Sequence, residues 1–226
     1  MTEADIRRAA EEVGFDACGV ATARRLDADA EVMDKWVEQG LHGNMDYLER
    51  NREKRYDPRE LVEGGKTVVV CLLTYAHSGH DYHRAVKSKL YQLEALLRER
   101  YGDEIVGAGQ HIFCDSAPFL ERRWAVLAGL GQIGRNHQLI HPELGSMVHP
   151  GELVLQCEVE CGNASEQKDI CGDCHRCEEA CPTGALRQQV WDARLCVAYK
   201  THHCLVCQQA CPYNKQQINK ITSISR

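Results

Sequence analysis

The stretch CGDCHRCEEACPTGAL, residues 171–186, decides how the last part of this sequence is organised. Its four cysteines follow the spacing C-x2-C-x2-C-x3-C-P. A related run, CLVCQQACP, occupies residues 204–212 and is preceded by Cys196. Ten of the 13 cysteines lie between Cys157 and Cys211. In a reducing compartment such clustering favours metal ligation over disulfide bonds.

Two cysteine runs that both end in Cys-Pro fit the plan of proteins that hold two [4Fe–4S] clusters. In that plan the last cysteine of each run binds the cluster of the other run. One cluster is therefore predicted to be bound by Cys171, Cys174, Cys177 and Cys211. The other is predicted to be bound by Cys181, Cys196, Cys204 and Cys207. Structural zinc is the alternative, because C-x2-C pairs also build four-cysteine zinc sites.

The remaining cysteines have less specific patterns. Cys157 and Cys161 are spare ligands or, as we expect, packed thiols. Cys18, Cys71 and Cys114 lie in apolar runs and are predicted to be small core residues.

The first 160 residues predict an α/β domain, because helical and strand patterns alternate along them. Helices are expected over residues 2–13, 29–50, 81–101 and 122–131. Strands are expected over residues 15–22, 66–76 and 111–115. The chain would then divide into an α/β domain at residues 1–160 and a cysteine-rich module at 161–226. The module is too short for a large core, so bound metals would stabilise it.

Charge and hydropathy exclude several classes of protein. The net charge of −6 argues against a protein that coats nucleic acid broadly. No apolar run approaches the roughly 20 residues of a membrane helix. The first residues, MTEADIRRAAEEVGF, show no apolar leader. We therefore expect a cytoplasmic protein without membrane contact.

Asp115 is the first candidate for a catalytic group outside the cysteine runs. It lies where a predicted strand ends in a Ser-Ala-Pro turn, a common position for such groups in α/β folds. The alternative is that Asp115 only caps the following turn or helix. GLGQIG, residues 129–134, has dinucleotide-site glycine spacing but follows a helix, which argues against that site. DYHRAV imitates a corrinoid motif, but Val86 replaces its glycine, so His83 is not expected to bind cobalt.

Four stretches, in order, resemble the epoxyqueuosine reductase family, corrinoid and iron–sulfur enzymes of the last step of queuosine synthesis in tRNA. They are GFDACGVA, WVEQGLHGNMDYLERNREKRYDPREL, DSAPFLERRWAVLAGLGQIGRN followed by GSM and GEL, and the paired cysteine runs. Reductive dehalogenases share this cofactor layout but usually carry an export signal.

The resemblance implies a nitroreductase-like α/β domain that holds cobalamin, followed by a small α+β ferredoxin-like domain with two [4Fe–4S] clusters. Asp115 matches the general acid of the family, which would protonate the departing epoxide oxygen. The positions that match cobalamin-contacting segments are Arg55, Asp115, Asn136 and Leu139. An external low-potential electron donor is implied as well.

Departures from the family pattern leave the substrate open. The printed sequence ends soon after CPYNK, where typical members continue with a helical-repeat domain that helps to hold tRNA. Gln132 and Arg135 replace a common aromatic residue and lysine. The chain is also acidic, whereas tRNA binding needs phosphate contacts. We predict an oxidoreductase that acts on epoxyqueuosine in tRNA. The alternatives are a corrinoid reductase of a small molecule and a two-cluster electron carrier without corrinoid.

Overall fold

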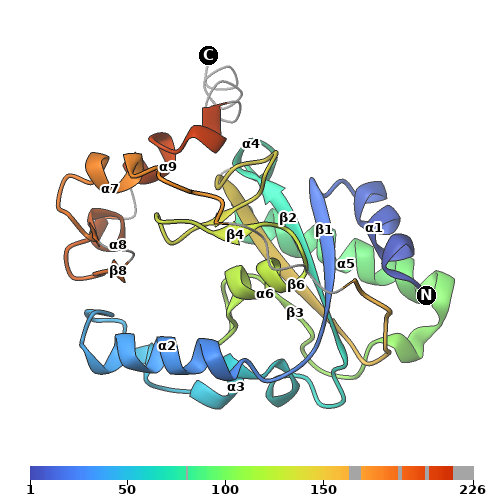
Figure 1. Cartoon of the computed structure of the whole chain (residues 1–226). Coiled ribbons are helices and arrows are strands. Elements are labelled where there is room, and N and C mark those ends of the chain that lie inside the picture. Colours follow the sequence, from blue (N-terminus) through green and yellow to red (C-terminus); the bar gives the residue numbers. More distant parts are fainter. Residues whose placement is uncertain (80, 163–168, 188–189, 202–203, 216–226) are drawn as a thin grey trace.

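The computed structural model describes residues 1–79, 81–162, 169–187, 190–201 and 204–215. A four-stranded sheet forms its centre, with helices on both faces (Figure 1). Its strands are β1 (Ala17–Thr22), β2 (Thr67–Thr74), β3 (Ile112–Phe113) and β6 (Val148–Leu155). The longer helices are α1 (Glu3–Glu12), α2 (Asp27–Glu38), α5 (Tyr82–Tyr101) and α6 (Glu121–Leu127). The predicted mixture of helices and strands is confirmed.

The connecting segments contain short elements. Between the longer ones lie η1 (Asp46–Leu48), α3 (Arg52–Tyr56), η2 (Pro58–Glu60), α4 (Tyr75–Ser78), η3 (Asp103–Ile105), β4 (Gln132–Ile133) and β5 (Leu139–Ile140). The cysteine-rich part contains α7 (Arg176–Ala180), β7 (Leu186–Arg187), β8 (Val190–Trp191), α8 (Val197–Thr201), α9 (Val206–Gln209) and η4 (Pro212–Asn214). The helix expected over residues 29–50 is therefore shorter and ends before Gly40, which has φ +68°.

The sheet order is β1-β2-β6-β3, and each neighbouring pair is antiparallel. All eight residues of β2 are buried, because the strand is central and covered on both faces. Strand β6 lies beside β2, although its sequence VHPGELVL does not predict a strand. Pro, Gly and Glu have low strand propensity, and here pairing with β2 and β3 overrides it.

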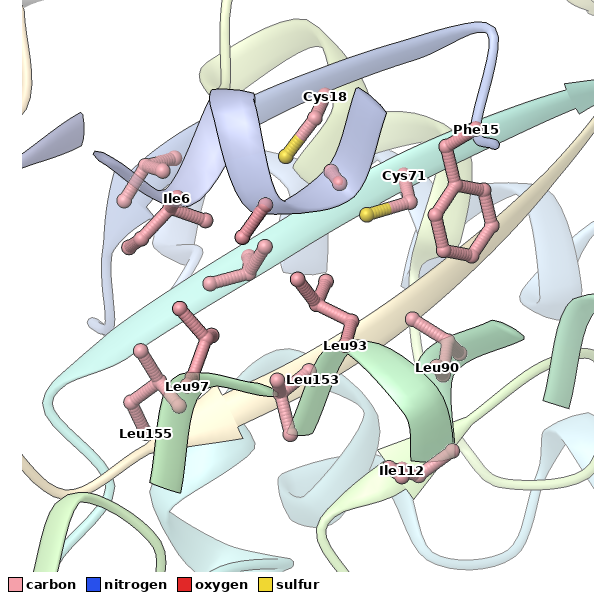
Figure 2. Packing of buried hydrophobic residues seen from close by; sticks show 14 of the residues in the cluster. Ile6, Phe15, Cys18, Cys71, Leu90, Leu93, Leu97, Ile112, Leu153 and Leu155 are labelled. Atoms are coloured by element: carbon pink, nitrogen blue, oxygen red, sulfur yellow. The ribbon is translucent and has the colours of Figure 1, made fainter. Parts of the chain in front are cut away.

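Two apolar layers follow from the alternation of side chains along the strands. On one face, α1 and α5 pack on Cys18, Cys71, Leu153 and neighbouring residues (Figure 2). Leu90, Leu93 and Leu97 of α5 point at this face, as their helical spacing predicts. On the other face, Trp124 and Ala125 of α6 cover Val70, Phe113 and other residues. Cys18, Cys71 and Cys114 are buried, as predicted.

The glycine-rich segment after α6 is a turn that leads into β4. Gly131 has φ +141°, and an added Cβ would lie 2.1 Å from the carbonyl oxygen of Ile140. This close approach explains the need for glycine at that position. Asp81 caps α5 by accepting a hydrogen bond from the backbone N–H of Arg84, so DYHRAV begins a helix as predicted.

The cysteine-rich part packs against the rest of the chain through specific contacts. The helices α7, α8 and α9 gather on one side of the molecule, away from α1 and α5 (Figure 1). Asn214 is fully buried and bonds to Ser146 in two ways, through Oδ1 at 2.6 Å and Nδ2 at 2.8 Å. Trp191 stacks on Trp36 of α2 with ring centroids 5.5 Å apart. The domain boundary at residues 160 and 161 stays a prediction.

Among the described residues, no helix combines the length and apolar character that crossing a bilayer requires.

Candidate active site

A cavity of about 610 Å³ lies where the cysteine-rich part meets the first part of the chain. Its size is in the range of cofactor and substrate sites. Its lining includes Asp115, Glu121, Arg122, Asn136 and Leu139 from the first part of the chain. From the cysteine-rich part it includes Trp191, Tyr199 and four cysteines: Cys181, Cys196, Cys204 and Cys207. The predicted acid and one predicted cysteine quartet therefore share one cavity.

Asp115 lies in the turn between β3 and α6, with its side chain 64% exposed. Its φ of +53° is in the left-handed region, which costs energy for a residue with a side chain. Glu121 accepts a hydrogen bond from the backbone N–H of Asp115 and so holds the turn. The hydroxyl of Tyr82 donates to Asp115 Oδ2 at 2.7 Å. Asp115 thus lines the cavity and has a hydrogen-bond partner of its own, a placement that is compatible with its predicted role.

Aromatic side chains line the cavity beside Asp115. His149 stacks between Tyr75, at 4.3 Å, and Tyr82, at 3.9 Å between ring centroids. Burial lowers the pKa of His149 to about 4, so the ring is neutral at neutral pH. Burial also raises the pKa of Tyr82, and its hydrogen bond to Asp115 adds to this. His83 is near as well, with Nε2 4.0 Å from Asp115 Oδ2.

Two further carboxyls lie close to Asp115. Burial raises the pKa of Glu121 to about 7, with the Asp115 charge adding to the rise. Glu152 of β6 has 0% exposed surface, and neither carboxyl oxygen has a hydrogen-bond partner among the described residues. Burial raises its pKa well above the usual range, and the charges of Glu121 and Asp115 add to this. Neither Glu121 nor Glu152 was predicted from the sequence as a site residue.

A second, smaller cavity of about 230 Å³ holds the other cysteine quartet. Its lining includes Cys171, Cys174, Cys177 and Cys211. The backbone N–H of Arg135 donates to Cys171 Sγ at 3.4 Å, and the Arg135 guanidinium donates to the Gly172 carbonyl at 2.8 Å. The eight cysteines predicted as cluster ligands thus line the two cavities in two groups of four.

Burial and neighbouring cysteines raise the pKa of two of these thiols, Cys207 and Cys211. Burial raises the pKa of Cys207 to about 11, and the nearby Cys204, Cys196 and Cys181 raise it further. Burial also raises the pKa of Cys211, and the charges of the nearby Cys171 and Cys174 add to the rise. Within the described part of the chain, no three His, Cys, Asp or Glu side chains converge tightly enough to hold a metal ion unaided. The ligand assignment therefore stays a prediction.

Asn136 lines both cavities and is only 3% exposed. Its Oδ1 accepts from the backbone N–H of Gln138, whereas its Nδ2 has no partner among the described residues. A buried donor of this kind suits a polar group bound in the cavity. Leu139 also lines the large cavity, and this placement is compatible with its predicted role.

Arg55 lies outside the linings of both cavities. It is buried, and its guanidinium donates to the carbonyls of Leu48, Arg50 and Tyr47. It does not line either cavity described above, so its observed role is to hold the turn at residues 47–50. Direct contact of Arg55 with a cofactor stays a prediction. Cys157 and Cys161 pack beside the core layer under α1 and α5.

Comparisons with known proteins agree with this geometry. The epoxyqueuosine reductase of Cyclobacterium marinum is 35% identical over 93% of this chain and 78% of its own. The chain belongs to the epoxyqueuosine reductase family. The family model described as a 4Fe-4S double cluster binding domain matches residues 170–203.

Solved structures of the family superpose on most of the chain. The epoxyqueuosine reductase from Streptococcus thermophilus has a TM-score of 0.82 at 27% identity, covering 94% of this chain and 66% of its own. An epoxyqueuosine reductase with an epoxyqueuosine-modified tRNA-Tyr stem loop has a TM-score of 0.80 at 25% identity, with 94% and 65% covered. The chain thus spans slightly less than two thirds of these reductases. A reductive dehalogenase shares the fold at a TM-score of 0.57 and 16% identity over 93% of this chain.

Proposed function

We propose that this protein is a cobalamin- and iron–sulfur-dependent reductase that converts epoxyqueuosine to queuosine in tRNA. The observation that carries this proposal is the large cavity, whose lining contains both Asp115 and a complete cysteine quartet. Family membership and the relative solved with a modified tRNA stem loop support the choice of substrate.

The donor sets of the two cavities fit the cofactors. Each cavity offers four thiols, the number that one [4Fe–4S] cluster binds. Cobalamin, when bound, supplies a very strong nucleophile and reductant to the site. Asn136, with its buried Nδ2, and Leu139 are the residues that we expect to hold it. The quartet of Cys181, Cys196, Cys204 and Cys207 lines the same cavity as Asp115, and the other quartet lines the smaller cavity together with Arg135 and Asn136.

The protein's own contribution is position, exclusion of water and a proton. Asp115 is placed to protonate the epoxide oxygen as it departs. Tyr82 orients the Asp115 carboxyl from one side, and Glu121 holds its backbone. The aromatic rings of Tyr75, His149 and Trp191 form apolar walls that limit water around the reacting atoms.

The test is reductive turnover by anaerobically reconstituted protein, with an epoxyqueuosine-containing anticodon stem loop and reduced methyl viologen as the electron donor. Wild type is expected to form queuosine, and Asp115→Asn to lose about 100-fold or more in rate. Full activity of Asp115→Asn removes Asp115 as the acid. Cobalamin binding without turnover of the RNA indicates a small-molecule substrate. Two clusters without cobalamin binding indicate an electron carrier.

A further inference from the structure

The proposed reaction, on which this inference rests, needs more protons than Asp115 carries. Reduction of an epoxide to an alkene breaks both C–O bonds, forms a second bond between the two carbons and releases the oxygen as water. The change consumes two electrons and two protons. A low-potential one-electron donor, acting twice, supplies the electrons. One carboxyl holds one proton at a time, so a second proton source must lie within reach.

Glu121 has the position for this role. It lines the same cavity as Asp115, and its Oε1 accepts the hydrogen bond from the Asp115 backbone N–H. This contact leaves Oε2 to carry a proton. Glu121 is the first residue of α6, which packs on the central sheet, so its place is fixed by the fold.

Glu152 lies under α6, behind Glu121. It pairs in register with Phe113 of β3 and Val70 of β2, and both of these belong to the layer that α6 covers. Paired residues of antiparallel strands point to the same face, so the Glu152 side chain points toward α6. Ionising both Glu121 and Glu152 would place two like charges in a region of low dielectric constant. The pair therefore retains at least one proton.

The titratable and charged groups around Asp115 and Glu121 come from all surrounding elements. They are Tyr47 of η1, Tyr75 of α4, Tyr82, His83 and Lys87 of α5, Cys114 after β3, Arg122 of α6, and His149 and Glu152 of β6. A proton donor works best when its pKa is near the working pH. The pKa of Tyr82 and that of Cys114 are raised by burial, whereas that of His149 is lowered to about 4. Lys87 donates to Ser116 Oγ at 3.0 Å.

His83 is the alternative candidate for the second proton source. Its Nε2 is 4.0 Å from Asp115 Oδ2, but its side chain is 46% exposed and is not part of the cavity lining. Glu121 is the better placed group, because it faces the cavity, contacts Asp115 and has a buried carboxyl behind it.

We propose that Glu121 is a second proton-carrying carboxyl of this site, which reloads Asp115 through water in the cavity, and that buried Glu152 helps it to retain its proton. Water is needed for the transfer, since Glu121 Oε1 is engaged by the Asp115 backbone and Asp115 Oδ2 by Tyr82.

Glu121→Gln tests this, because the amide oxygen can still accept from the Asp115 backbone while the acidic proton is lost. Glu143→Gln is the matched control, since Glu143 is exposed and lies outside the cavity lining. Iron, sulfide and cobalamin contents should equal those of wild type in both variants. Single-turnover rates with the modified stem loop are measured between about pH 5 and about pH 9. The wild-type rate should fall as the pH rises through about 7. Glu121→Gln should be about 10-fold slower or more at acidic pH and lack this step.

A second measurement does not depend on the substrate. Infrared difference spectra of the cofactor-loaded protein without RNA should show a carboxylic acid band that disappears near pH 7 in wild type and Glu143→Gln. In Glu121→Gln this titrating band should be missing, whereas any band of buried Glu152 should stay. If wild type has no band that titrates near pH 7, the inference is overturned, even if the RNA is reduced. A band without any RNA turnover refutes the proposed function but leaves Glu121 as the protonated group. A rate step that survives in Glu121→Gln but vanishes in His83→Gln assigns the role to His83 and overturns the proposal.

Discussion

Replacing Glu152 by Gln should raise the free energy of unfolding above that of wild type by more at neutral pH than at acidic pH. Glu152 is 0% exposed and its oxygens have no partner among the described residues, so its neutral form is strongly favoured in the fold. Its pKa is raised well above the usual range by burial. Gln has the same shape and no charge, so it removes the titration while keeping the packing.

The sign and the size of the effect follow from proton linkage. A carboxyl whose pKa is raised by folding binds its proton more tightly in the folded state. Its stabilising effect is complete below the pKa of the unfolded chain and is lost as the pH rises toward the folded pKa. The loss is about 1.4 kcal/mol for each pH unit in that window. As the pH rises by about two units above about pH 5, the free energy of unfolding of Glu152→Gln should therefore increase by about 2–3 kcal/mol relative to that of wild type.

The measurement is the anaerobic melting temperature of cofactor-loaded wild type and Glu152→Gln at about pH 5.5 and about pH 7.5. For a chain of this size, 1 kcal/mol shifts Tm by about 2–4 °C, so the difference between the proteins should change by about 5–10 °C. Glu143→Gln is the exposed control and should follow wild type at both values. A difference between Glu152→Gln and wild type that does not change with pH refutes the argument, because it means that Glu152 is ionised in the fold.

Three further predictions concern other parts of the structure. Asn214→Ala removes two hydrogen bonds to Ser146 and one to the Gln208 carbonyl, and should lower the unfolding free energy by about 2–4 kcal/mol, seen as a lower Tm. An unchanged Tm would show that these contacts do not hold the cysteine-rich part. Gly131→Ala places a Cβ 2.1 Å from the Ile140 carbonyl oxygen and should cost about 2 kcal/mol or more. Cys204→Ala should lower the iron content of the anaerobic protein by about half. Loss of all iron would contradict two separate clusters.

The paired cysteine runs and the α/β part are visible in the sequence because they are local patterns. C-x2-C spacing, helical spacing in α5 and the apolar run of β2 each depend on nearby residues. Strand β6 was missed because its partners, β2 and β3, are distant in the sequence. The predicted role of Arg55 was assigned by resemblance, and its bonds to the carbonyls of residues 47–50 are visible only after folding.

By itself, the sequence determined the type and spacing of the candidate donor groups: eight cysteines in two runs and an aspartate after a predicted strand. Residue type and spacing determine which atoms can bind a metal, whatever surrounds them. Only the tertiary structure decided that Asp115 and one quartet line the same cavity, that Glu121 contacts Asp115 there, and that Glu152 is buried. The pKa of a carboxyl depends on burial and on charges that are near in space. The sequence does not give these, because they arise where β6, α6 and the turn after β3 meet.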